Sequence, residues 1–351
     1  MVGRYIRNSE KLNNSFECDY IKLGTSLSVS GSGKHHISKW FRYFKILWLT
    51  MYKSLVFKPQ LVYITLTSSG IGFYKDAIVA LLVKAMGKKV VYHLHNKGVR
   101  KQQSNFLDDL LYKLVFKNTD VILLSPLLYP DIQKYVPRGR VHYCNNGIPR
   151  IIEKVTMANE FPEEKEVEIL CLSHLIRSKG IFKLLEACKL LKDKGLAFRC
   201  VFVGGEGDIT EEMFHDKVQA LGLEQQVLYA GRKYGDKKIA IYKQADIFVL
   251  YSYDDCFPLV ILEAMQFSLP VIASNEGALS NIVEHGETGF VIEKDRPTML
   301  ADILALLIQD KKLRDQMGRK GHERYKENFT MEVFEQKFSH IMKEITNEQI
   351  A

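Results

Sequence analysis

Short runs of β-branched and other apolar residues alternate along the chain with stretches in which apolar residues recur at helical spacing. In the first half, strands are predicted at 60–66, 88–95, 120–125 and 140–148, and helices at 77–86 and 105–117. After an acid-rich connection at 150–166, strands are predicted at 167–173, 198–205, 226–231, 246–252 and 270–274, with helices between them. The tail from about Ala301 is predicted to be helical. This alternation is typical of βαβ units and predicts two doubly wound α/β domains joined near Arg150.

The length and composition of the chain agree with two globular domains. It has 351 residues, of which 46% are hydrophobic, enough for two cores. The six cysteines are scattered without a C-x-x-C pair, so neither a disulfide framework nor a zinc site is predicted. No segment has the pattern of a signal peptide, and the apolar runs are shorter than the roughly 18 to 20 residues of a spanning helix. The expected location is the cytoplasm.

Charge is distributed unequally between the two halves. Residues 1–150 contain 23 Lys and Arg against 8 Asp and Glu, whereas residues 151–351 contain 26 against 33, which gives net charges of +15 and −7. Such asymmetry indicates that the first half meets an anionic partner, either nucleic acid, a phosphorylated substrate or an acidic membrane face. No zinc finger, RNP sequence or similar module is present, so we do not expect nucleic acid as the partner.

The segment 37–57 is predicted to form an amphipathic helix that contains both tryptophans. Its apolar residues share one face: Ile37, Trp40, Phe41, Phe44, Leu47, Trp48, Met51 and Leu55. Its basic residues lie opposite: Lys39, Arg42, Lys45 and Lys53. The pattern favours a core helix of the first domain with a solvated basic face. The alternative is a helix that lies on the membrane and is attracted to anionic lipid.

Two carboxylates eight positions apart, Asp255 and Glu263, flank the start of a predicted helix. The preceding strand ends at Ser252, and Pro258 suits the first helical turn because its missing N–H would have no partner there. The backbone around Phe257, Pro258, Leu259 and Val260 then forms an anion site at the positive end of the helix dipole. Asp255 can accept hydrogen bonds from the hydroxyls of a sugar whose phosphate lies on those amides. The alternative is that Asp255 only caps the helix and Glu263 is solvated.

Four segments of the second half occur in a characteristic order: "LSHLIRSKGIFKLLEA" (172–187), "FVGGEGD" (202–208), "DCFPLVILEAM" (255–265) and "GETGFVI" (286–292). This order resembles that of the family-four retaining glycosyltransferases of the GT-B fold, also called glycosyl transferases group 1. The resemblance implies two Rossmann-like domains facing a central cleft. Residues 1–149 form the acceptor-side domain, residues 150–325 bind the nucleotide sugar, and a helix at 326–351 packs back toward the first domain.

The resemblance also implies roles for particular residues. Asp255 stands where the family's E-x7-E signature has its first glutamate, so Asp255 and the backbone at Phe257 and Pro258 hold the donor sugar and phosphates, and Glu263 binds the ribose. The donor site further includes Lys179, which neutralises the departing diphosphate, and Gly204. His174 replaces the family's arginine, and Arg177 is a candidate second cation. His95 is expected near the reacting sugar, and the neighbouring His93 is interpreted as structural.

The activity implied is transfer of a sugar, with retention, from a nucleotide donor, most often a UDP-sugar, to a hydroxyl of a glycan or polyprenyl-linked glycan. This fits polysaccharide synthesis, for capsule or O-antigen, by a protein at the inner face of the plasma membrane. Neither a metal nor another cofactor is expected. No strong protein base is expected either, because in this family the leaving phosphate helps to deprotonate the acceptor, unlike the paired carboxylates of glycosidases. The alternatives are an epimerase or phosphorylase of the same fold, or an inactive binding protein.

The start of the chain differs from the family pattern. The segment "MVGRYIRNSEKLNN" is predicted to be helical, whereas domains of this class begin with a strand and a glycine-rich loop that lead into such a helix. We therefore expect that about 15 to 20 residues, one strand and its loop, are missing before Met1.

Overall fold

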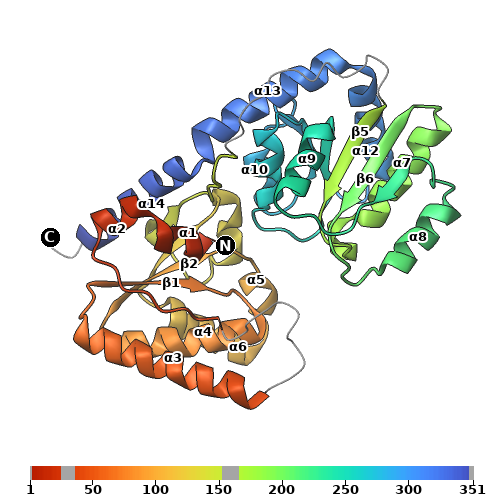
Figure 1. The fold of residues 1–351 in the computed structure, drawn as a ribbon. Coiled ribbons are helices and arrows are strands. Elements are labelled where there is room, and N and C mark those ends of the chain that lie inside the picture. Colours follow the sequence, from red (N-terminus) through yellow and green to blue (C-terminus); the bar gives the residue numbers. More distant parts are fainter. Residues whose placement is uncertain (1, 25–35, 152–165, 348–351) are drawn as a thin grey trace. The chain divides into compact units, whose positions relative to one another are not determined.

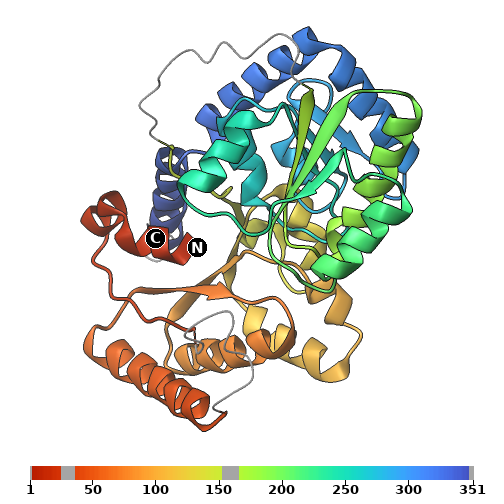
Figure 2. The same ribbon diagram turned by 45° about the vertical axis from the view of Figure 1, so that its right-hand side comes forward.

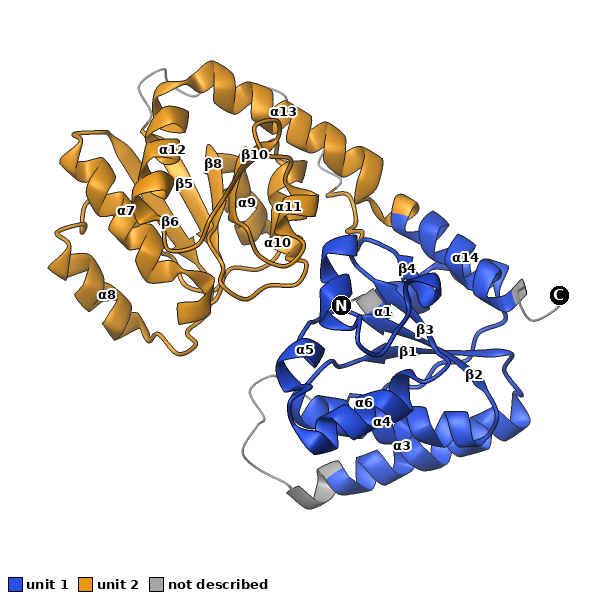
Figure 3. Cartoon of the chain, turned by 180° about the vertical axis from the view of Figure 1, so that it is seen from behind, with its two compact units in different colours: residues 1–145, 334–351 blue, residues 146–333 orange. Residues whose placement is uncertain are grey.

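The computed structural model describes residues 2–24, 36–151 and 166–347, and the chain divides into two compact units. Unit 1 comprises residues 1–145 and 334–351, and unit 2 comprises residues 146–333 (Figure 3). The chain therefore contributes to unit 1 twice, before and after it forms unit 2.

Unit 1 contains a parallel sheet of four strands in the order β1-β2-β3-β4. The strands are β1 (Leu61–Leu66), β2 (Lys89–Leu94), β3 (Asp120–Leu123) and β4 (Val141–Tyr143). Helices α4 (Gly70–Ala85) and α6 (Phe106–Phe116) connect consecutive strands, as parallel pairing requires, and both lie on the same side of the sheet (Figure 1). Strands β2 and β3 are almost entirely buried because both faces of the sheet are covered.

The remaining helices of unit 1 lie around this sheet. Helix α3 (His36–Val56) packs on α4, and α14 (Met331–Asn347) lies on the opposite side of the sheet (Figure 1). There the ring of Phe338 contacts Tyr63 edge to face, at 5.3 Å between centroids. The short elements are α1 (Val2–Asn8), α2 (Glu10–Ser15), α5 (Val99–Gln102) and the 3-10 helices η1 (Pro126–Asp131) and η2 (Arg138–Arg140). The predicted helical start is present as α1 and α2, and the missing strand and loop stay a prediction.

Helix α3 has the predicted extent but packs by a different face. Its buried side chains are Tyr43, Ile46, Thr50 and Ser54, and the first two contact Val79 of α4. Six residues of the predicted core-facing stripe are instead 42–72% exposed: Trp40, Phe41, Phe44, Trp48, Met51 and Leu55. The expectation that the apolar face is covered by the domain is therefore wrong. None of the described helices combines the length and the hydrophobicity that crossing a bilayer demands.

Unit 2 contains a parallel sheet of six strands in the order β10-β9-β8-β5-β6-β7. The strands are β5 (Val167–Leu172), β6 (Phe198–Val203), β7 (Val227–Tyr229), β8 (Ile247–Leu250), β9 (Val271–Ser274) and β10 (Gly289–Ile292). The first five were predicted, whereas β10 was recognised only as part of a motif. From β5 the chain adds strands first on one side and then on the other. The neighbours β5 and β8 therefore form a topological switch point, where ligands of such sheets bind beyond the carboxyl ends of the strands.

Helices cover both faces of the sheet of unit 2. Figure 2 shows its strands between the green helices α7 (Ile181–Asp193) and α8 (Glu211–Ala220) on one side and the teal helices α9 (Asp236–Gln244) and α10 (Leu259–Gln266) on the other. Helix α12 (Pro297–Gln309) packs on α7, and α13 (Lys311–Asn328) packs on α10. The short elements are η3 (Arg177–Lys179) and α11 (Leu279–Ile282).

Candidate functional site

Lys179 and Asp255 meet at the switch point of unit 2, although they are 76 positions apart in the sequence. Lys179 ends η3, which follows β5, and Asp255 lies in the loop after β8. The Lys179 ammonium donates to Asp255 Oδ2 at 2.8 Å and to the carbonyl of Asp254 at 2.8 Å. The two side chains are 22% and 16% exposed, so the ion pair is accessible at its edge but shielded from bulk water. The structure thus brings together two residues that were predicted to contact the donor.

Backbone contacts hold the loops after β5 and β8 against each other. Tyr253 N donates to the carbonyl of Ser178 at 2.6 Å. Gly180 has a φ of 68°, and a Cβ at this position would lie 2.0 Å from the carbonyl oxygen of Tyr251. Only glycine therefore allows the turn after Lys179 to approach the end of β8 this closely. This packing fixes the backbone at Gly180, the residue that directly follows Lys179 of the ion pair.

The loop that carries Asp255 is held from the other side by the segment after β9. A Cβ on Gly277, which has a φ of 55°, would lie 2.3 Å from the carbonyl oxygen of Asp255. Ala278 N donates to the carbonyl of Cys256 at 2.9 Å. Pro258 occupies the N-cap of α10, and no side chain caps this helix, so the alternative in which Asp255 is a helix cap is wrong. The first N–H groups of a helix, here those of Leu259 and Val260, have no partner within the helix.

Glu263 lies in the second turn of α10 and is bound by two side chains of α9. Its Oε1 accepts from the Lys238 ammonium at 2.8 Å, and its Oε2 accepts from the Tyr242 hydroxyl at 2.9 Å. Burial, followed by the nearby Glu263 charge, raises the pKa of Tyr242 well above its ordinary value, so the hydroxyl stays a donor. The alternative of a solvated Glu263 is wrong. Because a carboxylate offers about four acceptor positions, two remain for ligand hydroxyls.

The two predicted auxiliary cations have separate environments. His174 Nδ1 lies 3.2 Å from Gly205 N and 3.3 Å from the carbonyl oxygen of Gly205, so the backbone of Gly205 holds the imidazole ring. The Arg177 guanidinium lies over the ring of Phe182, 5.4 Å from the centroid. The described contacts of both side chains therefore lie outside the Lys179–Asp255 pair.

Gly204 and Phe257 have clear packing functions. A Cβ on Gly204 would lie 1.9 Å from the carbonyl oxygen of Ser173, so glycine is required where the ends of β5 and β6 approach. The Phe257 side chain is buried, and its ring meets Phe329 at 6.1 Å between centroids. Phe257 therefore anchors the loop, which leaves only its backbone available to a ligand.

His95 belongs to unit 1, directly after β2. Its ring lies 4.0 Å from that of His93, as expected for alternate residues on one face of a strand. His93 is fully buried, and its Nδ1 is hydrogen-bonded to the Tyr63 hydroxyl at 2.8 Å. Burial, followed by the proximity of His95, lowers the pKa of His93 well below its ordinary value. These contacts agree with a structural function for His93.

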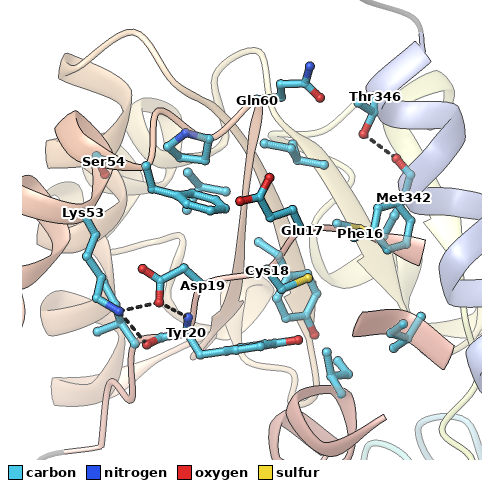
Figure 4. A pocket seen from close by; sticks show the side chains of 18 of the residues that line it. Phe16, Glu17, Cys18, Asp19, Tyr20, Lys53, Ser54, Gln60, Met342 and Thr346 are labelled. Carbon is cyan, nitrogen blue, oxygen red and sulfur yellow. Dashed lines mark hydrogen bonds and ion pairs between the residues drawn. The ribbon is translucent and has the colours of Figure 1, made fainter. Parts of the chain in front are cut away.

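Unit 1 also contains a cavity of about 630 Å³, which includes none of the predicted site residues. It is lined by residues 16–21, the end of α3, the first half of β1 and three residues of α14: Phe338, Met342 and Thr346 (Figure 4). Ligands of parallel sheets bind at the carboxyl ends of the strands, whereas this cavity borders the opposite half of β1. We therefore place the candidate site at the switch point of unit 2. Within the described residues, no group of three or more His, Cys, Asp or Glu side chains is arranged to hold a metal ion.

Sequence reasoning missed Lys238, Tyr242 and Gly277. The first two are four positions apart, so the sequence could have predicted that they lie on one face of α9. That this face meets Glu263 depends on the packing of α9 against α10, which has no signal in the sequence.

Comparison with known proteins shows which protein family is similar to the part of the chain that contains this site. The family model described as glycosyl transferases group 1 matches residues 153–324. This part of the chain matches that family, as predicted from the ordered motifs.

Among individual proteins, the capsular polysaccharide biosynthesis glycosyltransferase CapM of Staphylococcus aureus is 28% identical over 196 residues, which cover 54% of this chain and 50% of CapM. The D-inositol 3-phosphate glycosyltransferase of Corynebacterium efficiens is 30% identical over 159 residues, 45% of this chain and 37% of that protein. The chain thus spans about half the length, or less, of these curated relatives.

Two solved structures resemble most of the chain. Sucrose-phosphate synthase from Thermosynechococcus elongatus matches with a TM-score of 0.72 at 20% identity, over 87% of this chain and 78% of the synthase. Anabaena HepE in complex with UDP matches with a TM-score of 0.71 at 18% identity, over 86% of this chain and 82% of HepE. These likenesses show the shared fold and confirm the predicted GT-B class.

Proposed function

We propose that the protein is a retaining glycosyltransferase that moves a sugar from a UDP-sugar to a hydroxyl of a glycan or lipid-linked glycan, in the synthesis of a cell-surface polysaccharide. The observation that carries this proposal is the meeting of Lys179 and Asp255 at the switch point, beside the start of α10. A cation, a carboxylate and uncapped helix amides converge there, which suits a ligand that has both a diphosphate and sugar hydroxyls.

Each group has a distinct task in this proposal. The Lys179 ammonium leaves Asp255 to bind the diphosphate and stabilises its charge as the sugar departs. Asp255, released from that pair, accepts hydrogen bonds from sugar hydroxyls. Glu263, oriented by Lys238 and Tyr242, accepts from the hydroxyls of the ribose. The expected contact of His95 with the transferred sugar stays a prediction, and no metal takes part in the proposed reaction.

The identities of the donor and the product are supported by relatives. HepE was solved with UDP and, in another structure, with UDP-glucose, which supports a uridine nucleotide. CapM acts in capsular polysaccharide biosynthesis, which supports a glycan product. A lipid-linked acceptor would place the reaction at the cytoplasmic face of the membrane.

Calorimetric titration of the full chain with UDP, GDP and ADP tests the donor site. We expect UDP to bind most tightly, and comparable weak binding of all three would contradict the uridine assignment. Incubation with a panel of UDP-sugars tests the reaction, because transfer releases UDP only when an acceptor is present. Isomerisation of the sugar without acceptor would indicate an epimerase, and binding without turnover would indicate a binding protein.

A further inference from the structure

Three neighbouring helices of unit 1 expose stripes of large apolar side chains. Helix α3 exposes Trp40, Phe44 and Trp48, although it is anchored to the unit by its opposite face. Helix α4 exposes Ile71 and Ile78, which are seven positions apart and therefore lie on one side of it. Helix α6 exposes Phe106, Leu107, Leu110 and Leu114 at helical spacing.

The three stripes form a single surface, which we call the apolar face. Helix α4 contacts both α3 and α6, and Figures 1 and 3 show all three on the same side of the sheet. Most of the exposed large hydrophobic side chains among the described residues belong to these helices. Monomeric proteins rarely expose so much contiguous apolar surface unless it binds a partner or a membrane.

The charges around the apolar face are complementary to an anionic partner. Helix α3 contains four Lys and Arg residues and no acidic residue, and of these cations Lys53 is paired with Asp19 of the preceding segment. Exposed cations also flank α6, with Arg100 and Lys101 before it and Lys117 after it.

The acidic residues of these helices are engaged within unit 1. Asp108 is buried and accepts from the Tyr74 hydroxyl at 2.7 Å. Asp109 accepts from Lys134 at 2.5 Å and from Lys113 at 2.6 Å. Asp76 accepts from Thr67 N at 3.0 Å. The electrostatic character of the surface is therefore set by its cations.

We propose that the apolar face docks unit 1 on a bilayer that contains anionic phospholipid. Trp, Tyr and Phe side chains favour the boundary between headgroups and acyl chains, and flanking Lys and Arg bind anionic headgroups. The rings of Trp48 and Tyr52 stack at 5.3 Å, which presents two amphipathic side chains side by side. Docking requires no nucleotide sugar, so this proposal is independent of the proposed transfer.

A second copy of the chain fits this surface less well. In a symmetric dimer the same patch faces itself, which would bring the cations of α3 toward those of its counterpart. Interface cores are depleted of lysine, and like charges placed opposite each other disfavour association.

Vesicle binding by the full chain tests the proposal directly. Both tryptophans of the chain, Trp40 and Trp48, lie on α3, so their emission reports on the surface itself. With phosphatidylcholine vesicles containing phosphatidylglycerol, we expect co-sedimentation and a blue shift of the emission. Vesicles of phosphatidylcholine alone should bind at least about tenfold less, and raising NaCl from about 0.05 to 0.5 M should release the protein.

Variants locate the contact on the apolar face. Phe44→Glu combined with Trp48→Glu should lower vesicle binding more than about tenfold and leave Trp40 as the reporter. The matched control, Met299→Glu with Leu306→Glu, makes the same charge change at exposed positions of α12 in unit 2 and should bind like the unchanged chain. Lys45→Glu reverses one exposed charge and should lower binding roughly fivefold or more. Far-UV circular dichroism and thermal unfolding verify that each variant is folded.

Four results would overturn the proposal, the first three of which concern vesicle binding. These are no binding to either vesicle, equal binding to neutral and anionic vesicles, or binding that survives the double substitution on α3. A fourth is a concentration-dependent dimer that the same substitution disrupts, without vesicle binding, which would assign the surface to a second copy.

Discussion

The two units are built on the same parallel α/β plan but differ in how their strands are ordered and where their charges lie. In unit 2 the strand order reverses at β5, so two loops converge beyond β5 and β8 and bring Lys179 and Asp255 together. In the described part of unit 1 the strands follow one another from β1 to β4 without such a reversal. The distinctive surface of unit 1 is instead the outer side of α3, α4 and α6. The candidate site of unit 2 therefore results from the order of its strands. The apolar face of unit 1 results from the kind of side chains that α3, α4 and α6 expose.

This contrast implies that the two surfaces can be altered separately. Substitutions at the switch point should change nucleotide binding and transfer without affecting vesicle binding, and substitutions on the apolar face should do the reverse.

The largest effect is expected from Lys179→Ala. It removes the cation that we propose binds the diphosphate, and it leaves Asp255 partly buried without its partner. We expect transfer to fall roughly 10²- to 10³-fold, and UDP affinity to fall far more than uridine affinity. Calorimetry with both ligands measures the difference. Lys194→Ala, which breaks the exposed Lys194–Asp302 pair of the same unit, is the matched control and should change neither. Equal losses for UDP and uridine would exclude charge neutralisation as the function of Lys179.

Asp255→Asn should reduce transfer roughly 100-fold, because the neutral amide binds sugar hydroxyls less strongly than a carboxylate. Affinity for free UDP should not fall, since the substitution leaves Lys179 available to the diphosphate. Asp255→Glu restores the side-chain length usual in the family, and we expect it to change the preferred sugar while stability is retained. Initial rates with several UDP-sugars measure both effects. If Asp302→Asn, the exposed counterpart, reduced transfer as much, the assignment would be wrong.

Glu263→Gln should weaken UDP binding by about 1–3 kcal/mol, because a charged hydrogen bond to ribose is lost. Tyr242→Phe removes only one orienting donor and should cost about 0.5–1.5 kcal/mol. Calorimetric titration measures both, with Glu186→Gln as the control for a surface ion pair on α7. A loss of thermal stability without a change in UDP affinity would show that the contacts between α9 and α10 are structural.

The smallest effect concerns the pH dependence of unit 1. The pKa of His93 lies below its ordinary value, so below about pH 6.5 the unfolded chain binds a proton that the folded unit does not. The free energy of unfolding should therefore fall on acidification, by at most about 1.4 kcal/mol per pH unit. We expect His93→Asn, which keeps an acceptor for Tyr63, to remove this contribution. Denaturant unfolding between about pH 7.5 and 5.5 measures the change, a range of about one unit on either side of the ordinary histidine pKa of about 6.5.

The sequence predicted the strands and the acidic loop because their signals are local. Buried parallel strands appear as apolar runs, and Pro258 indicates the start of α10 whatever surrounds it. The pairing of Lys179 with Asp255 could not be predicted from spacing, because it follows from the adjacency of β5 and β8. Lys238 and Tyr242 were missed for the same reason.

The error on α3 has a different cause. An amphipathic pattern identifies which residues share a face but not what that face contacts. Here the helix is anchored by a narrower stripe in which Thr50 and Ser54 are buried beside Tyr43 and Ile46. The wider apolar stripe was therefore assigned to the wrong environment: six of its eight predicted residues are exposed, whereas Leu47 packs against the buried cluster. The side chain of Ile37 lies outside the described part of the chain.

Helix α14 has a consequence for the order in which the two units can fold during synthesis. The ribosome must translate residues 146–333 before it reaches the part of α14 that belongs to unit 1. At about 5–20 residues per second, this takes roughly 10 to 40 s. Throughout that interval Tyr63 and His93 lack the Phe338 ring that packs on them, and Lys89 lacks its hydrogen bond to the carbonyl of Ile345. Unit 2, which is continuous in sequence, is therefore expected to complete its folding first. Until α14 is synthesised, one face of the sheet of unit 1 stays accessible to chaperones.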